Sequence, residues 1–368
     1  MYADNMNIDM NNKPECDYSL YTFSKTKGGY SISEYLGFDE STITIPDNYK
    51  GEPVIRIEKS VFSDCISLKT VFLGQNISVI EKNAFSGCSN LESVLGCTNL
   101  TYISHNVFSH CIKLSYIDIS DNLCFLGCSA LSYTAITSFK LPQKIDYISR
   151  GLFNGCVNLS KIIIHDNVIA IGRKSFEGCE KLSKVIIPVN VKYIGSEAFL
   201  NCIGLKELII YSSDSNFIGD NILMKTHIWQ PDRRYNPRIQ YSVLSNVTVY
   251  CRPGSNAQLY CRKQGVQCRK LEWSGVSTSN SFIKDPIGIF VIVNSYDKYK
   301  NDQIRAIREL EKDYNVIIED TLESEFRIFF YNPQDITQDV INRLIIDPFS
   351  KTHQVFSGVS ISTKESIL

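Results

Sequence analysis

The chain has 368 residues, a formal net charge of −1 and a hydrophobic fraction of 43%. This length allows one or two domains, and this hydrophobic fraction is enough for a buried core. A charge near zero excludes a general attraction to nucleic acid or to anionic membranes. No apolar run approaches the roughly 20 residues that span a bilayer, so we expect no membrane span.

The N-terminal residues predict a leader and a cap. Residues 1–17 are polar and acidic, which predicts a disordered leader, and they lack the basic and apolar segments of a signal peptide. Residues 18–23 and 30–33 are joined across a Lys-Gly-Gly turn at 27–29, which predicts a β-hairpin. We expect this hairpin to cap the open end of the repeats that follow.

A phrase with the pattern Phe-x-x-Cys-x-x-Leu then recurs about every 23 residues, and a short aliphatic strand follows it each time. A fixed period in the twenties predicts a solenoid, in which each turn buries its apolar face against the next. The Phe position holds Phe62, Phe85, Phe108, Leu131, Phe153, Phe176 and Phe199. The Cys position holds Cys65, Cys88, Cys111, Thr134, Cys156, Cys179 and Cys202.

Within each repeat, two kinds of local structure are predicted. The segment between Phe and Leu fits a tight turn or a short 3₁₀ segment. The strand alternates apolar and variable residues, as in Leu182-Ser-Lys-Val185-Ile-Ile187, and this period of two places one face inward. Stacked turns are therefore expected to form a parallel sheet along the coil, with inward Phe, Leu and Ile side chains in continuous ladders.

The fourth repeat departs from the pattern. It carries Leu131 in place of Phe and Thr134 in place of Cys, and it is one residue shorter than the others. Thr134 can place a hydroxyl where the thiol would lie. We therefore expect a local irregularity at this turn and no domain boundary.

The repeat array is predicted to end in a closing turn. Residues 212–242 break the period and are predicted to be an irregular loop. A strand over 247–251, an N-cap at Ser255 and a helix that ends at Gly265 follow. The solenoid is therefore expected to span residues 18–271.

A second domain is predicted after a linker. Residues 272–285 are rich in Ser, Gly and Thr, which predicts the linker, and residues 286–368 follow as an α+β domain. Strands are expected at 287–294, 316–319, 326–331 and 355–361, and helices at 300–314 and 335–346. The order β-α-β-β-α-β predicts a ferredoxin-like sandwich. With the solenoid, this gives an α+β class for the whole chain.

Two families resemble parts of the sequence. BspA-type leucine-rich repeats read roughly Ile-Pro-x-x-Val-x-x-Ile-Gly-x-x-Ala-Phe-x-x-Cys-x-x-Leu, and the turn from Ile187 to Leu205 matches nearly every position. This resemblance covers about residues 18–270 and implies a role in adhesion or protein binding, as in bacterial and some protist surface proteins. The element order and Leu344-Ile-Ile-Asp347-Pro348-Phe349 also resemble the small PurS-type module of purine biosynthesis, which implies an assembly partner without catalytic residues.

The thirteen cysteines are predicted to be structural. Six of them occupy the repeat position, where a buried thiol acts as a small hydrophobe with a weak donor. Disulfides between repeats are disfavoured, because identical positions in parallel neighbours point the same way. No Cys-x-x-Cys pair occurs, so we expect no metal site. Free thiols fit a reducing compartment, so we expect a cytoplasmic protein, with non-standard export to the cell surface as the alternative.

The outward strand positions, two and four residues after the Leu position, are the candidates for a binding surface. Contiguous exposed apolar surface marks interaction sites, and the isoleucines at 163, 186 and 209 are unusual for exposed positions. The candidate partner-binding residues are Tyr116, Asp118, Lys140, Lys161, Ile163, Lys184, Ile186, Glu207 and Ile209. Two alternatives stay open: β-branched residues simply suit strands, or the C-terminal domain folds back over these residues.

The sequence contains no P-loop and no Gly-x-Ser-x-Gly motif, so nothing in it indicates catalysis. We predict a non-enzymatic protein–protein interaction module that needs no cofactor and binds a protein of unknown identity through the outward strand face. One alternative is a surface adhesin for a host or matrix protein or a glycan. The other is an accessory subunit of an enzyme complex that acts through the C-terminal domain.

Overall fold

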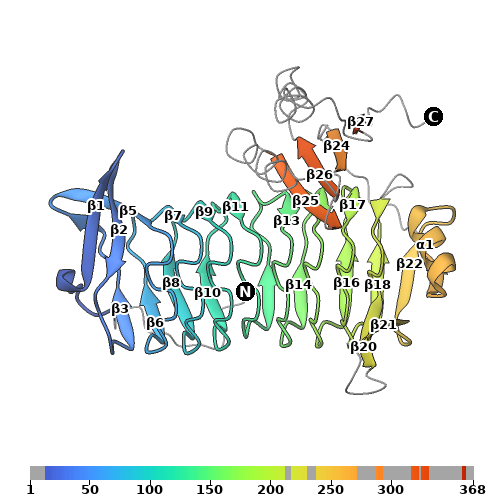
Figure 1. Ribbon diagram of the computed structural model, residues 1–368, viewed down its shortest axis with the longest axis horizontal. Coiled ribbons are helices and arrows are strands. Elements are labelled where there is room, and N and C mark those ends of the chain that lie inside the picture. Colours follow the sequence, from blue (N-terminus) through green and yellow to red (C-terminus); the bar gives the residue numbers. More distant parts are fainter. Residues whose placement is uncertain are drawn as a thin grey trace. The chain divides into compact units, whose positions relative to one another are not determined.

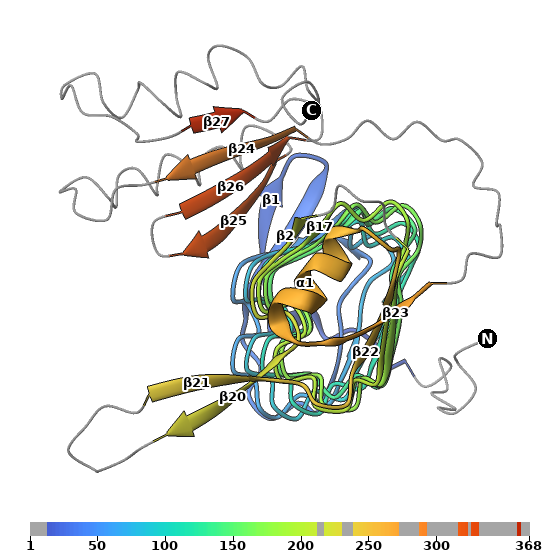
Figure 2. The same cartoon turned by 90° about the vertical axis from the view of Figure 1, so that its right-hand side faces the viewer.

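The computed structural model describes residues 13–211, 217–229, 238–271, 287–292, 316–322, 325–330 and 359–361. The chain divides into two compact units, Met1–Glu272 and Trp273–Leu368. The first unit is a coil of stacked turns, seen from the side in Figure 1 and along its axis in Figure 2. Most of the predicted leader, residues 1–12, lies outside the described residues.

Each turn of the coil contributes one strand to each of two ladders. The first ladder follows the predicted strand positions and contains β3 (Thr42–Thr44), β6 (Thr70–Phe72), β8 (Ser93–Cys97), β10 (Tyr116–Ile119), β12 (Ser138–Lys140), β14 (Lys161–Ile163), β16 (Lys184–Ile187), β18 (Glu207–Ile210), β22 (Thr248–Cys251) and β23 (Gln267–Lys270). The second contains β5 (Glu52–Ile57), β7 (Val79–Ile80), β9 (Tyr102–Ile103), β11 (Phe125–Leu126), β13 (Tyr147–Ile148), β15 (Ala170–Ile171), β17 (Tyr193–Ile194) and β19 (Phe217–Ile218). Neighbouring strands within each ladder are parallel.

The second ladder was not predicted as strand. Its members after β5 are two residues long, and from β7 to β17 the second residue of each, such as Ile80 or Ile103, is buried. A strand of two residues shows no alternation, so the sequence signalled it only as a pair of apolar residues three apart.

The N-terminal hairpin is confirmed. A 3₁₀ turn at Tyr18–Leu20 leads into β1 (Tyr21–Thr26), which pairs antiparallel with β2 (Gly29–Tyr35). A further short strand, β4 (Asn48–Tyr49), pairs antiparallel with β5. The ring of Tyr35 lies 4.9 Å from that of Phe62, so the hairpin covers the first layer of the aromatic core.

A column of stacked phenylalanines runs through the coil. Successive rings are nearly parallel: the centroids are 4.8 Å apart for Phe62 and Phe85, and 5.2 Å apart for Phe176 and Phe199. The rings are fully buried, and each burial contributes about 1.5–3 kcal/mol. The backbone N–H of Phe85 also donates to the carbonyl of Val107 in the next turn at 3.0 Å. One turn alone could not satisfy these groups, so the turns depend on each other for stability.

Five of the six repeat cysteines are buried, as expected, and Cys65 in the first turn is half-buried. The Sγ of Cys88 donates to the carbonyl of Phe62 at 3.0 Å, and the Sγ of Cys202 donates to the carbonyl of Phe176 at 3.0 Å. Burial raises the pKa of the Cys202 thiol to about 12. The thiol therefore fills a small apolar space and satisfies a buried carbonyl at the same time.

The irregularity predicted at the fourth turn is confirmed. Both ladders are interrupted there, between β10 and β12 and between β11 and β13, and Leu131 separates the two stacks of phenylalanine. The Thr134 hydroxyl donates to the carbonyl of Leu131 at 2.9 Å and lies 3.3 Å from the Sγ of Cys156. The buried core nevertheless continues through Leu131 and Leu141, so no domain boundary occurs.

The loop predicted for residues 212–242 is wrong in part. Met224–Trp229 (β20) and Arg238–Val243 (β21) form a regular antiparallel hairpin that projects from the coil in Figure 2. Residues 212–216 and 230–237 lie outside the described residues. Sequence reasoning missed the hairpin because loss of the repeat period was interpreted as loss of secondary structure.

The closing turn is confirmed. The helix α1 (Asn256–Gln264) begins after Ser255, whose hydroxyl accepts a hydrogen bond from the backbone N–H of Gln258. It ends at Gly265, whose φ of 69° places it in the left-handed region that glycine adopts without strain. Figure 2 shows α1 across the end of the coil.

In the second unit, the four predicted strands are present. They are β24 (Ile287–Ile292), β25 (Val316–Leu322), β26 (Glu325–Phe330) and β27 (Val359–Ile361), in one antiparallel sheet of order β25-β26-β24-β27. The predicted helices at 300–314 and 335–346 lie outside the described residues, so the sandwich stays a prediction. Among the described residues α1 is the single α-helix, so this part of the chain is mostly β and the expected α+β class is not borne out there.

Removing one ring of the phenylalanine column should destabilise the whole coil. We expect Phe85→Ala to lower the free energy of unfolding by about 3–5 kcal/mol, because it leaves a cavity between two layers. Urea unfolding followed by circular dichroism measures this. Phe38→Ala is the control, because that ring is 87% exposed. Equal effects of the two substitutions would contradict the stacked column.

The repeat thiols should be unreactive while the protein is folded. At mildly alkaline pH, a thiol reagent is expected to modify the exposed Cys124 and to leave the buried Cys88, Cys179 and Cys202 unmodified, because burial blocks access. Burial also raises the pKa of Cys179 and Cys202, and a side-chain hydrogen bond with Cys111, followed by burial, raises the pKa of Cys88. Peptide mass spectrometry after a short reaction identifies the modified sites, and the urea-unfolded protein is the control. Modification of Cys179 as fast as Cys124 would show that the turns are not closed.

Candidate binding surface

The outward face of three consecutive strands carries most of the predicted residues. In β14, β16 and β18, the core side chains Ile162, Val185 and Leu208 alternate with outward positions. Ile186 lies directly opposite Ile209 in the register of β16 and β18. Ile163 occupies the corresponding position one turn earlier, although the hydrogen-bonded ladder is interrupted between β14 and β16. We call Ile163, Ile186 and Ile209 the isoleucine row.

The isoleucine row is open to solvent at its centre. Ile186 is 45% exposed, whereas Ile163 and Ile209 are half-buried. In β22, Tyr250 lies opposite Ile209 and is also half-buried, so it extends the apolar strip by one strand. An aliphatic side chain left in water beside others of its kind is an available contact for a partner.

A charged row runs beside the isoleucines. The Nζ of Lys184 lies 2.7 Å from the Oε2 of Glu207 on the neighbouring strand, and this contact raises the pKa of Lys184. Lys140 and Lys161 are exposed at the β12–β14 end. The charged row therefore continues from β12 to β18.

Tyr116 and Asp118 lie in a different segment of the ladder from the other seven candidate residues. Both lie in β10, which pairs with β8, and the ladder is interrupted before β12. Both are half-buried, and burial followed by the charge of Asp118 raises the pKa of Tyr116. The nine predicted residues thus fall into three segments, on β10, on β12–β14 and on β16–β18.

The outward face of the first turns is covered. Phe72 and Leu95 lie opposite each other at outward positions of β6 and β8, yet they are only 4% and 2% exposed and do not belong to the main core. On the adjacent β3, the hydroxyl of Thr44 donates to the carbonyl of Pro14 at 2.8 Å. The N-terminal segment thus contacts this face, and the accessible part of the first ladder begins beyond it.

Sequence reasoning missed a second set of exposed apolar residues. The position after the repeat cysteine holds exposed aliphatic side chains in alternate turns, at Ile66, Ile112, Val157 and Ile203. We call these four residues the turn edge. Ser89, Ala135 and Glu180 hold the same position in the turns between them, so the edge is not continuous. Comparison of this one position across the repeats would have found it.

Two aromatic rings stack next to the turn edge. The rings of His110 and Tyr133 are 4.6 Å apart and nearly parallel, and both side chains are exposed. Both residues have positive φ, 62° and 55°, at a position where Gly87, Gly155 and Gly178 stand in other turns. His105 is half-buried, and its Nδ1 accepts a hydrogen bond from the backbone N–H of Cys128.

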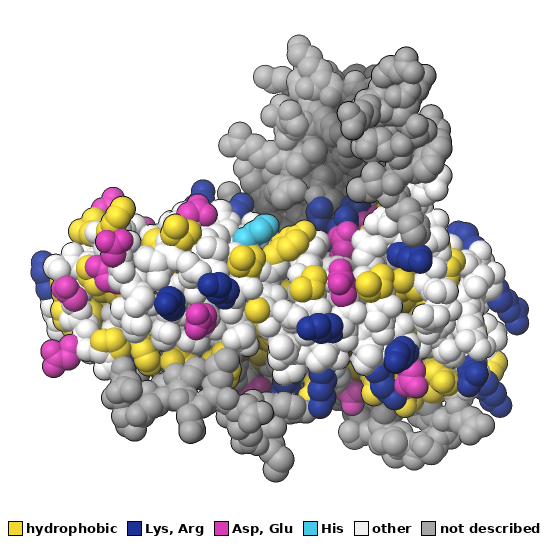
Figure 3. Space-filling view, turned by 90° about the horizontal axis from the view of Figure 1, so that it is seen from below, with side chains coloured by type: hydrophobic (Ala, Val, Ile, Leu, Met, Phe, Trp, Pro, Cys, Tyr) yellow, Lys and Arg dark blue, Asp and Glu magenta, His cyan; other side chains and the backbone are white. Residues whose placement is uncertain are grey.

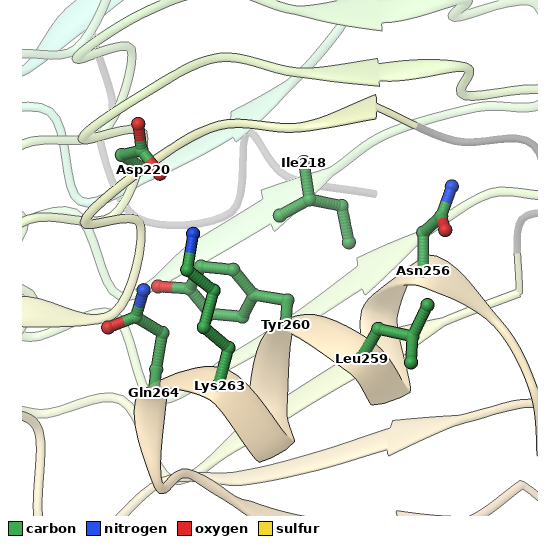
Figure 4. Close-up of a pocket in the computed structure, with 7 residues that line it drawn as sticks. All are labelled: Ile218, Asp220, Asn256, Leu259, Tyr260, Lys263 and Gln264. Carbon is green, nitrogen blue, oxygen red and sulfur yellow. The ribbon is translucent and has the colours of Figure 1, made fainter.

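A shallow hollow lies at the end of the coil, beside α1. Its volume is about 250 Å³, and Figure 4 shows Leu259, Tyr260 and Lys263 of α1 facing Ile218 and Asp220. The hydroxyl of Tyr260 accepts a hydrogen bond from the backbone N–H of Leu223 at 3.3 Å, so this side chain holds α1 against the coil. The lining of this hollow contains no serine, cysteine or histidine.

Neither metal ligation nor a membrane span is found in the part of the chain that the structure describes. There, no three His, Cys, Asp or Glu side chains are grouped as ligands, and no helix is long and apolar enough to cross a bilayer. Basic, acidic and hydrophobic side chains are intermixed on the face shown in Figure 3. A nucleic-acid surface would instead gather basic residues.

Comparison with known proteins agrees with the fold. A family described as BspA type Leucine rich repeat region matches residues 17–134 and 125–232, with six copies of the repeat. A leucine rich repeat protein of T. pallidum is 26% identical, with 52% of this chain and 91% of that chain covered and a TM-score of 0.49. A leucine rich cell surface protein from Faecalibacterium prausnitzii A2-165 is 23% identical, with a TM-score of 0.52. The match covers 67% of this chain and 66% of that protein. A search of curated proteins found no match.

The inward and outward positions of β16 should respond differently to the same charge. We expect Ile186→Asp to change the free energy of unfolding by no more than about 0.5 kcal/mol, because the side chain is already in water. Val185→Asp, one residue away, should abolish folding because it buries an unpaired carboxylate. Thermal unfolding of both variants decides this, and a large loss in the Ile186 variant would place that residue in the core.

Proposed function

Because this chain belongs to the BspA-type leucine-rich repeat family, we propose that it holds a protein partner against the outward face of β14, β16 and β18. Leucine-rich repeats of this kind are generally binding modules without catalytic activity. The solenoid serves this role because the inward positions of each turn are fixed by packing, while the outward positions can match a partner.

The isoleucine row is the observation that carries the proposal. Three aliphatic side chains recur at the same outward position in consecutive turns, and the central one is exposed. A partner would lay an apolar ridge along this row. Lys140 and Lys161 at one end favour acidic residues in the corresponding part of the partner, because charge complementarity fixes orientation.

Other parts of the coil present less exposed, continuous apolar surface to a partner. Phe72 and Leu95 at the N-terminal end of the first ladder are already buried. The turn edge is interrupted by Ser89 and Glu180. The face of β14, β16 and β18 therefore combines apolar continuity and accessibility better than either.

A surface adhesin for a host or matrix protein or a glycan is a second candidate. The fold likeness to the leucine rich cell surface protein from Faecalibacterium prausnitzii favours it. Location separates the two candidates. We keep a cytoplasmic location as the proposal, because a reducing compartment maintains the buried thiols as donors to carbonyl groups. Detection of the native protein on intact cells by surface biotinylation would support the adhesin.

For the second unit, we propose a ferredoxin-like sandwich over 286–368 after a linker at 272–285. The strand order β25-β26-β24-β27 supports this, because the first and third strands of a β-α-β-β-α-β unit lie side by side at the centre of its sheet. The family match ends at residue 232, so the PurS-type resemblance and a role as an accessory subunit stay predictions.

A comparative pull-down tests the binding surface. The full chain would be cross-linked in extracts of its native host, as the wild type, as Ile163→Asp with Ile186→Asp, and as a turn-edge control, Ile112→Asp with Ile203→Asp. We expect at least one partner to fall about tenfold with the first variant, a loss of about 1.4 kcal/mol in binding, and to persist with the control.

Two outcomes would overturn the proposal. One is retention of every wild-type partner by the variant of the isoleucine row. The other is loss of partners from the turn-edge control alone, which would move the surface to that edge. Circular dichroism of each variant establishes that it is folded before binding is compared.

A further inference from the structure

We propose that Cys251 and Cys268 are a redox-active dithiol that closes to a disulfide at the C-terminal end of the solenoid. Cys251 ends β22, and Cys268 lies in the adjacent β23. Their Sγ atoms are 3.1 Å apart, and both thiols are free. A disulfide bond is about 2.05 Å long, so the Sγ atoms must approach by about 1 Å. Because the two residues are diagonal in the strand register, closure also shifts the backbone of β23 relative to β22.

The repeat cysteines are arranged differently. Each of Cys88, Cys111 and Cys202 donates its thiol to a carbonyl of the preceding turn, and equivalent positions in parallel strands point the same way. The two cysteines of the closing turn are not at equivalent positions. In the β22–β23 register, Val249 lies opposite Cys268 and Cys251 lies opposite Lys270, so the two cysteines face each other along a diagonal.

Accessibility determines the order of reaction. Cys268 is half-buried, on the last strand of its sheet, whereas Cys251 is 1% exposed. Cys268 is therefore the thiol that meets an oxidant from solution. Burial, followed by the nearby Cys268, raises the pKa of Cys251 to about 12, which keeps Cys251 protonated until the mixed disulfide has formed beside it.

The oxidant is a low-molecular-weight disulfide of the glutathione class. The Cys268 thiolate attacks one sulfur of the oxidant, the S–S bond breaks, and one glutathione thiolate leaves. Cys251 then loses its proton to solvent, attacks the Sγ of Cys268, and expels the second glutathione thiolate. Two protein thiols become one disulfide, and one oxidised glutathione becomes two reduced ones.

A third thiol, that of Cys261, could also pair with Cys268, so the choice of Cys251 as the partner can be tested. Cys261 of α1 is buried next to the pair, and burial followed by the charges of Cys268 and Cys251 raises its pKa above the ordinary range. It competes with Cys251 for Cys268. The 3.1 Å contact favours Cys251, so exchange among the three should end in the 251–268 bond.

Closure would fix the point at which the chain leaves the solenoid. The bond joins β23 to β22 and encloses α1 in a covalent loop from residue 251 to residue 268. Residues beyond β23 lead to the second unit, Trp273–Leu368. A cross-link restricts the unfolded ensemble of the loop it closes, so the oxidised end of the coil should open less readily than the reduced one.

The test uses the full chain in a series of glutathione buffers of increasing oxidised fraction. After acid quenching and alkylation, trypsin should release a linked pair of peptides, 239–262 joined to 264–269, because Pro253 blocks cleavage after Arg252. Fragmentation of the pair distinguishes Cys251 from Cys261. We expect the linked pair in wild type and in Cys261→Ser, and its loss in Cys251→Ser, in Cys268→Ser and after treatment with dithiothreitol.

The exposed Cys124 is the internal control for oxidant activity. The proposal is wrong if Cys124 becomes glutathionylated while Cys251 and Cys268 are alkylated as free thiols. It is also wrong if the bond in folded protein joins Cys261 to Cys268, or if Cys268 stops at the mixed disulfide. Because three single variants are compared, loss of folding in one of them leaves the other two to decide.

Discussion

The structure depends on one constraint, which is that each turn must place its side chains directly above their counterparts in the turn before. Phe85 stacks on Phe62 at 4.8 Å, and the backbone N–H of Phe62 donates to the carbonyl of Ala84 at 2.7 Å. Ring stacking and backbone pairing thus require the same spacing between layers. The shorter fourth turn, with Leu131 in place of the ring, breaks the stack and interrupts both strand ladders, although the backbone N–H of Phe108 still donates to the carbonyl of Ala130 at 2.9 Å.

The same constraint explains why cysteine recurs without disulfides. Between two phenylalanine layers there is room for a small side chain, and the carbonyl of the preceding turn needs a donor. A thiol meets both requirements, as at Cys179, whose Sγ donates to the carbonyl of Phe153 at 3.3 Å. The hydroxyl of Thr134 also reaches a carbonyl, but that of Leu131 in its own turn. In the closing turn, where the period has ended, the Sγ atoms of Cys251 and Cys268 lie 3.1 Å apart.

The constraint also determines where a binding surface can form. Inward positions are fixed by packing, so variation is confined to outward strand positions and turn edges. Of these, the isoleucine row keeps one residue type in three consecutive turns. Towards the N-terminal end of the coil the equivalent residues, Phe72 and Leu95, are only 4% and 2% exposed. A repeated scaffold thus carries a surface that differs along its length.

The sequence by itself determined the repeat, its inward ladders, both caps and the irregular fourth turn, because each depends on local spacing that a period of 23 residues makes visible. Tertiary structure decided the rest. It placed Thr44 against Pro14, divided the nine candidate residues among three ladder segments, and formed the β20–β21 hairpin. It also brought Cys251 to Cys268. The contacts of Thr44 with Pro14 and of Cys251 with Cys268 depend on which segments meet in the fold, and no local pattern of residues encodes this. The β20–β21 hairpin joins segments close in sequence, and it was missed because loss of the repeat period was interpreted as loss of secondary structure.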